Sequence, residues 1–418
     1  VLHVEKPPRP KAGSTCERST IRPMTQQIFL AGGVRTPIGK FGGSLAKLSA
    51  PDLGVHAAVA ALDRAGVPAE AVDQALFGHG RQAGQGPNTG RQVSVRAGVP
   101  VEKPAWTVNM ACGSALKSVL LGADAIKLDQ AEIVLAGGME SISNTPYMLP
   151  RARWGYRLGN DKVVDGMYQD GFVCKLANQV MGETAETLAD QYELSREEQD
   201  AYAARSKNRS EAARARGRYE AEKVAITLKD RKKGEYAFNT DEHARDGVKA
   251  EKLAKLPPVF RAETGTVHAG NSSGITDGAA SILVLSEKAV EAHGVTPQAR
   301  LVAYTEAGVD PHVMGLGPVP AVKKLLDQTG LSVGDIDLWE LNEAFAAQVL
   351  ACNRELKIDE EKMNVDGGSI ALGHPIGATG CRILVTLLHS MAERDVKRGV
   401  ATLCISGGLG LAALVERV

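Results

Sequence analysis

The sequence has few cysteines, and the ones it has are isolated from one another. Its 418 residues include six, widely spaced and with no Cys-x-x-Cys pair. This pattern is typical of free thiols in a reducing compartment rather than of a disulfide framework. No spacing of histidine, cysteine and carboxylate residues predicts a zinc site. We therefore expect a cytoplasmic protein with no metal centre.

An excess of charge and a long hydrophobic run are also missing. Lysine and arginine total 49, aspartate and glutamate total 49, and the calculated pI is about 7.2. Such a balance argues against nucleic acid or a membrane surface as a partner attracted by bulk electrostatics. No apolar stretch approaches the roughly 18 residues that a membrane span needs. We expect neither kind of partner.

The length exceeds the size at which a single hydrophobic core stops growing, which predicts two or three compact units. Residues 1–24 differ from the rest, because "VLHVEKPPRPKAGSTCERSTIRP" is rich in proline and basic residues and lacks the apolar core of a secretory signal. We interpret residues 1–24 as a disordered arm or a misassigned start before Met24. A transit peptide is the third option.

Strand-like and helix-like runs alternate along most of the chain, which predicts an α/β protein with parallel strands covered by helices. The two halves also repeat each other. Residues 61–77 align with 325–341, and "EIVLAGG" (132–138) aligns with "TLCISGG" (402–408). This similarity favours two duplicated α/β units with a site at their junction.

The two duplicated units and the segment between them divide the chain into three parts. Residues 25–142 plus 275–296 form the expected N-terminal half, 297–418 the C-terminal half, and 143–274 an inserted loop domain. The insertion contains a charged, helix-like segment at 194–217, with a capping signal at Ser195.

Cys112 is the first candidate for chemistry. It lies in "TVNMACGSALKS" (107–118), just before apolar residues at helical spacing. The free N–H groups and partial positive charge of a helix N-terminus lower the pKa of a thiol, which makes it more reactive. Taken alone, a buried cysteine that packs as a small apolar residue is the more common case.

Three further segments carry residues that a reactive thiol needs. His374, between Gly373 and Pro375 in "GHPIGATG", is an imidazole that can take the thiol proton. Cys404 precedes a glycine turn and is interpreted as an acid/base for a carbanion, and the N–H of Ser406 as an oxyanion donor. Asn342 either caps a helix or holds a water or an oxyanion.

Together these segments resemble a known family. "NMACGSALKS", "NEAF", "GHPIGATG" and "CISGGLG", in this order, are similar to motifs of the thiolases, the CoA-dependent acetyl-CoA C-acyltransferases, and the resemblance spans Gln26 to Val418. It implies a duplicated thiolase-like fold, with two α/β halves in an αβαβα arrangement and an inserted loop domain. It also implies reversible thiolysis of 3-ketoacyl-CoA, or the reverse Claisen condensation, with ping-pong kinetics.

The resemblance also assigns roles. Cys112 would carry the acyl group as a thioester, and His374 would activate Cys112 and stabilise one oxyanion with a water held by Asn342. Cys404 would move the proton of the acetyl-CoA carbon. The backbone N–H groups of Cys112 and Ser406 would form the second oxyanion hole, although the family usually has glycine at position 406.

The same resemblance makes CoA a substrate rather than a bound cofactor. Ser273 would contact the pantetheine arm and Arg245 the nucleotide. Val180 and Met181 stand where short-chain family members have a His–Met pair, which favours longer 3-ketoacyl chains. A homo-oligomer, a dimer of dimers, is expected, with the Arg/Tyr-rich loop 147–159 as an interface.

The residues alone are also compatible with three other functions. A ketoacyl-synthase-like decarboxylating condensing enzyme would use one cysteine and would not need Cys404. A non-catalytic acyl-CoA-binding protein would not need Cys112. A cysteine hydrolase would release free acid without CoA.

Overall fold

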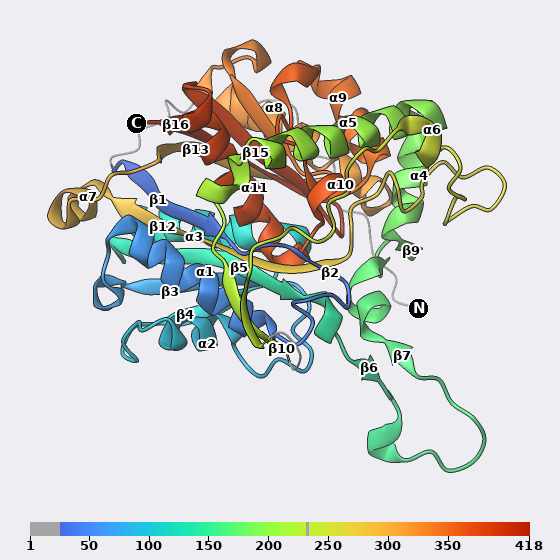
Figure 1. Ribbon diagram of the computed structural model, residues 1–418, viewed down its shortest axis with the longest axis horizontal. Helices are drawn as coiled ribbons and strands as arrows, with labels where there is room; N and C mark the ends of the chain where they lie inside the picture. The colour runs from blue at the N-terminus through green and yellow to red at the C-terminus, as the bar shows by residue number, and fades with distance from the viewer. Residues whose placement is uncertain (1–25, 231–233) are drawn as a thin grey trace, which may run out of the picture.

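A ten-stranded sheet runs through the computed structural model, which describes residues 26–230 and 234–418 (Figure 1). The strand order is β14-β15-β16-β13-β1-β12-β5-β3-β4, with β2 paired to β12. The expectation for residues 1–24 lies outside the described residues. The strands are β1 (Ile28–Arg35), β2 (Gly39–Lys40), β3 (Gln74–His79), β4 (Ala105–Val108), β5 (Ile133–Ser141), β12 (Thr276–Ser286), β13 (Ala299–Gly308), β14 (Leu338–Leu341), β15 (Arg398–Ile405) and β16 (Leu409–Arg417).

The sheet contains the same arrangement twice. In the first half β3 pairs with β5 in parallel, and β5–β12 and β12–β1 are antiparallel. In the second half β14 pairs with β15 in parallel, and β15–β16 and β16–β13 are antiparallel. The two sequence repeats lie on matching strands, β3 with β14 and β5 with β15. The halves join where β1 pairs with β13, and the predicted duplication is confirmed.

The three largest hydrophobic cores among the described residues lie between the layers. The central core surrounds α3 (Ser114–Lys127) and α11 (Ile376–Glu393), which pack on each other and on strands of both halves. The second core contains α1 (Ala50–Ala65) and α2 (Thr89–Arg96) on the outer face of the first half. The third contains α8 (Pro318–Thr329) and α9 (Ala346–Leu356) on the outer face of the second. The predicted αβαβα layering is confirmed.

The stretch between β5 and β12 is longer and less regular. The capping signal predicted at Ser195 is confirmed. The Ser195 hydroxyl accepts from the N–H of Glu198 at 3.1 Å, and the Glu198 carboxylate accepts from the N–H of Ser195 at 2.8 Å. The elements here are α4 (Met181–Gln191), α5 (Arg196–Ala215), α6 (Ala250–Leu253), and the pairs β6 (Tyr147–Met148) with β7 (Val164–Asp165), β8 (Val173–Cys174) with β9 (Gln179–Val180), and β10 (Ile226–Asp230) with β11 (Gly234–Phe238); α7 (Glu287–His293) follows β12.

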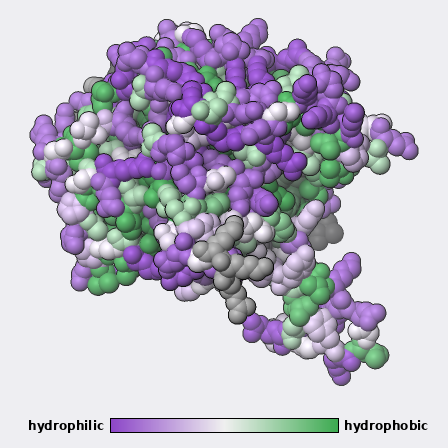
Figure 2. All heavy atoms as spheres, viewed as in Figure 1, coloured by the Kyte–Doolittle hydropathy of each residue, from purple (hydrophilic) through white to green (hydrophobic). Residues whose placement is uncertain are grey.

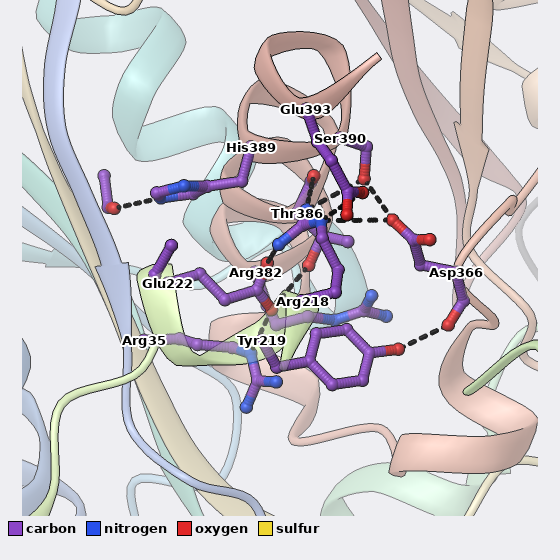
Figure 3. Close-up of polar contacts among 12 residues, drawn as sticks. Arg35, Arg218, Tyr219, Glu222, Asp366, Arg382, Thr386, His389, Ser390 and Glu393 are labelled. Carbon is purple, nitrogen blue, oxygen red and sulfur yellow. Dashed lines mark hydrogen bonds and ion pairs between the residues drawn. The ribbon is translucent and has the colours of Figure 1, made fainter. Parts of the chain in front are cut away.

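Buried ion pairs fix this stretch to the body of the protein (Figure 3). Arg35 on β1 binds Glu222 at 2.6 Å and Asp241 at 2.7 Å, and Arg218 binds Glu222 at 3.1 Å. Arg218 also reaches Asp366, at 3.2 Å. Burial alone raises the pKa of Glu222, but the charges of Arg35 and Arg218 outweigh it and lower that pKa. The paired charges therefore hold the segment that follows α5 in one position against both halves.

A hairpin-like arm formed by β6, β7 and their connection projects away from the layers (Figure 1, lower right). Large apolar side chains are exposed on it, with Trp154 at 83% and Leu158 at 100%. Apolar (green) side chains are visible on this arm in Figure 2. An exposed apolar patch of this kind marks a surface for contact with another molecule.

Among the described residues, no helix is long and apolar enough to cross a membrane.

Candidate active site

Cys112 lies on a sharp turn between β4 and α3. The turn, η2 (Ala111–Gly113), places Ala111 at φ 44°, a left-handed conformation that costs a non-glycine residue about 1–3 kcal/mol. The buried Ser114 hydroxyl stabilises this turn by donating to the carbonyl of Ala111 at 2.6 Å. Gly113 allows close packing on β15, because a Cβ there would lie 2.5 Å from the Ile405 side chain. The turn therefore presents Cys112 beside the end of β15.

His374 reaches Cys112 from the other half of the protein. It lies between α10 (Ser369–Leu372) and α11, after Gly373, whose φ of 106° favours glycine and where a Cβ would collide with Thr276. Nε2 of His374 is 3.3 Å from Sγ of Cys112, and Nδ1 is 2.6 Å from the hydroxyl of Thr379. These two contacts hold the ring at both nitrogens.

The Thr379 hydroxyl determines which nitrogen carries the proton. It donates to the carbonyl of Pro375 at 3.0 Å, so it accepts a hydrogen bond from Nδ1 of His374. Nε2 then carries the lone pair and faces the thiol of Cys112. This is the tautomer that can remove the thiol proton.

Burial disfavours the charged form of both groups. Burial, followed by the charges of Arg382 and Arg81, lowers the pKa of His374 to about 3. Burial raises the pKa of Cys112 and outweighs the opposing effects of Arg81 and the N–H of Ser406. The expectation that a helix end lowers the pKa of Cys112 is therefore wrong for its net direction, because burial is the larger effect.

Cys404 and Ser406 complete this cluster from the end of β15. The backbone N–H of Ser406 lies close enough to Cys112 to act on its sulfur and lower the pKa of the thiol. Cys404 is buried, and burial followed by the neighbouring Cys112 raises its pKa well above the ordinary value. Cys112, His374, Cys404 and Ser406 all line one cavity of about 570 Å³.

The rest of this cavity is mostly apolar, with polar groups at a few positions. The predicted CoA and substrate contacts Ser273, Arg245, Val180 and Met181 all line it. The other apolar residues in the lining include Phe41, Ile142, Met167, Phe172, Val259, Phe260, Met314, Phe345 and Ile376. A large apolar pocket with a few convergent polar groups is the usual form of a small-molecule site.

Comparison with known proteins identifies the family. The model of the thiolase N-terminal domain matches residues 28–288, and that of the thiolase C-terminal domain matches 295–417. An acetyl-CoA acetyltransferase of Cupriavidus necator is 48% identical over 390 residues, which cover 93% of this chain and 99% of that protein. The chain belongs to the thiolase family. It is a CoA-dependent acyltransferase of the kind its motifs predict.

Other relatives of this thiolase carry two kinds of name. An acetyl-CoA acetyltransferase of Escherichia coli is 48% identical over 394 residues, covering 94% of this chain and all of that protein. The crystal structure of human mitochondrial 3-ketoacyl-CoA thiolase in complex with CoA superposes with a TM-score of 0.91 at 42% identity, covering 94% of this chain and 98% of that one. The similarity is comparable for proteins named acetyl-CoA acetyltransferase and for those named 3-ketoacyl-CoA thiolase.

Asn342 lies next to the site but does not line the cavity. It follows β14, and the N-cap of α9 is Phe345, so the alternative that Asn342 caps a helix is wrong. Its Oδ1 accepts from the Ser369 hydroxyl at 2.6 Å, and that hydroxyl accepts from Arg382 at 2.6 Å. Its buried Nδ2 has no hydrogen-bond partner among the residues described. The amide is thus held by its oxygen, with its donor available.

Four residues beside the site are absent from the sequence prediction. Thr379 lies inside the "GHPIGATG" motif, five positions after His374, but its contact with the ring depends on the helical turn. Ser369 and Arg382 act on Asn342 from separate helices. Arg81 is part of a glycine-rich turn after β3, and nothing in the sequence indicates that it is buried.

Proposed function

We propose that this thiolase cleaves 3-ketoacyl-CoA with CoA, and runs the reverse condensation, through an acyl group carried on Cys112. The observation that carries the proposal is the 3.3 Å contact between the unprotonated Nε2 of His374 and the thiol of Cys112. As the sulfur attacks the ketone, His374 takes its proton. The nucleophile is therefore formed only where substrate is bound.

The remaining groups in the cavity have matching tasks in the first half-reaction. The C–C bond breaks and leaves a carbanion beside the thioester, and the high-pKa thiol of Cys404 protonates it to release acetyl-CoA. The N–H groups of Ser406 and Cys112 stabilise the oxyanion formed at the attacked carbonyl. Each such donor contributes about 2.7–4 kcal/mol.

In the second half-reaction the charges return to their starting state. The thiolate of Cys404 takes the proton of an incoming CoA thiol, which attacks the acyl group on Cys112. Cys112 leaves as a thiolate and recovers its proton from His374. The other oxyanion is stabilised by His374 and by a water that Asn342 holds.

Ser273 and Arg245 are proposed contacts for the pantetheine arm and the nucleotide of CoA. The apolar wall of Val180 and Met181, with the ring of Phe260 packed against Gly182, supports 3-ketoacyl chains longer than acetoacetyl. Such substrates arise in β-oxidation of fatty acids.

We also propose a cytoplasmic homo-oligomer, a dimer of dimers, assembled through the arm between β6 and β7. Its exposed apolar side chains, Trp154 and Leu158 among them, support an interface with another copy. The arm contains the 147–159 loop.

The direct test is a thiolysis assay with 3-ketoacyl-CoA substrates of graded chain length, applied to the natural enzyme and to Cys112→Ala and Cys404→Ser. We expect CoA-dependent cleavage that rises beyond the acetoacetyl substrate, and loss of turnover in both variants. Near-normal condensation by Cys404→Ser supports the ketoacyl-synthase-like alternative instead. Release of free acid without CoA supports a hydrolase, and unchanged function in Cys112→Ala supports a binding protein.

A further inference from the structure

Arg81 is a buried cation in the wall of the catalytic cavity. It follows β3 in the segment "GHGRQAG", is 5% exposed and lines the same cavity as Cys112 and His374. It lies close enough to lower the pKa of both of those residues. Arg81 therefore belongs to the lining of the cavity that contains Cys112 and His374.

This guanidinium lacks an anionic partner. Within residues 26–230 and 234–418, no carboxylate lies within ion-pair distance of Arg81, and its buried Nε makes no hydrogen bond. The guanidinium carbon of Arg81 lies over the ring of Phe172, 5.5 Å from the ring centre. Burying a charge without a partner is costly, and an arginine does not relieve that cost by losing its proton.

Glu140 is the buried carboxylate near it, but its oxygens are already used. They accept the backbone N–H groups of Gly80 at 3.2 Å, Arg81 at 3.1 Å and Gly377 at 3.0 Å, and lie 3.3 Å from Nε2 of His79. Glu140 therefore attracts Arg81 at a distance and binds the turn that carries it. Glu140 therefore leaves the buried Nε of Arg81 without a hydrogen-bond partner among the described residues.

The reaction itself does not use this cation. In the proposed function the oxyanions have donors in the N–H groups of Cys112 and Ser406 and in His374 with Asn342. The phosphates of CoA are separated from the reacting thioester by the whole pantetheine arm, so they cannot reach a group beside Cys112. The part of the substrate that remains as a binding partner for Arg81 is the acyl chain.

Resting on the proposed function, we infer that Arg81 recognises a carboxylate on the acyl chain, so that this thiolase prefers 3-ketoacyl-CoA substrates whose chain ends in a carboxylate. The planar guanidinium binds a carboxylate through two parallel hydrogen bonds. The neighbouring apolar lining, which includes Met167 and Phe172, packs along the methylene groups. A chain that ends in a methyl group leaves the buried charge unpaired.

The test compares two 3-ketoacyl-CoA substrates of equal carbon number, one ending in a methyl group and one in a carboxylate. The quantity measured is the ratio of their kcat/KM values, carboxylate over methyl, in the natural enzyme and in Arg81→Met, Arg81→Lys and Arg96→Met. Arg96, on α2, is a matched control because its side chain is 46% exposed and outside the cavity.

We expect a ratio above one in the natural enzyme and in Arg96→Met. In Arg81→Met it falls by at least about 30-fold, which corresponds to about 2 kcal/mol for removing one partner of a buried charge pair. Arg81→Lys keeps the charge without the paired donors and gives an intermediate ratio, and it serves if Arg81→Met does not fold.

Two results overturn the inference while the proposed function stands. One is a natural enzyme that cleaves the methyl-ended substrate but does not prefer the carboxylate. The other is an equal loss for both substrates in Arg81→Met, which assigns Arg81 to the reaction step instead. Failure to cleave either substrate refutes the proposed function itself.

Discussion

The hydroxyl of Thr379 lies 2.6 Å from Nδ1 of His374, on the side of the ring that faces away from Cys112. Thr379 is fully buried on the first turns of α11 and its own hydrogen is used by the carbonyl of Pro375. The Thr379 hydroxyl therefore pairs with the His374 tautomer that carries its proton on Nδ1. It prepares His374 as a base without touching the substrate.

Replacing Thr379 with valine removes this acceptor at nearly constant volume. We expect kcat to fall about 10–100-fold, because the ring loses its fixed tautomer and orientation. This is at or below the lower end of the roughly 100- to 10,000-fold that general-base catalysis contributes, since the base itself remains. Thr379→Ser keeps the hydroxyl and restores most of the activity. Equal losses in both variants would assign Thr379 to packing alone.

The raised pKa of the Cys112 thiol gives a pH dependence. Because burial raises the pKa of Cys112, the thiolate fraction is small at pH 7 and keeps growing above the ordinary thiol value of about 8.5. Alkylation by iodoacetamide, followed in Cys404→Ser so that one cavity thiol is counted, should accelerate through pH 9. A rate already constant at pH 7 contradicts this and indicates a resting ion pair with His374.

Much of the fold follows from local patterns. The repeated segments 61–77 and 325–341 each contain a helix end at a glycine, Gly66 or Gly330, both at positive φ, and then a buried strand. Such signals are short-range, so they can be read without knowing the packing. The capping box at Ser195 belongs to the same class.

The electrostatic state of the site could not be predicted in this way. The sign of the pKa change at Cys112 depends on how much protein surrounds the sulfur, which the adjacent helix does not reveal. The sequence allows Asn342 to cap a helix, but β14 ends at Leu341 and α9 begins at Ala346, so Asn342 lies in the connection between them. Burial of Arg81 likewise depends on segments distant in sequence, such as the one that carries Phe172.

The hydrogen bond from Ser369 to Asn342 gives a third test. Ser369→Ala frees the Asn342 amide to rotate, and we expect kcat to fall roughly fivefold, in line with about 1 kcal/mol for a typical hydrogen bond. Ser94→Ala is the control, because Ser94 is equally buried and its hydroxyl has no partner in the described part of the chain.

A double mutant separates positioning from stability. If Ser369 acts through the amide, Ser369→Ala has no further effect on kcat in an Asn342→Ala background. Fully additive losses would mean that Ser369 supports the site independently of Asn342.

The projecting arm gives a prediction about assembly. Trp154→Ser combined with Leu158→Ser should lower the mass measured by light scattering, because the apolar contact between copies is lost. Leu128→Ser, at a site that is 66% exposed beyond the end of α3, controls for the loss of surface apolar area. An unchanged mass in the double variant, or a monomeric natural protein, contradicts the proposed interface.

The most direct measurement is mass spectrometry of the protein after incubation with acetyl-CoA and an acid quench. We expect one acetyl group per chain on the peptide that contains Cys112, removed on addition of CoA and absent from Cys112→Ala. An active enzyme with no acetyl adduct, or with the adduct on Cys404, would contradict it.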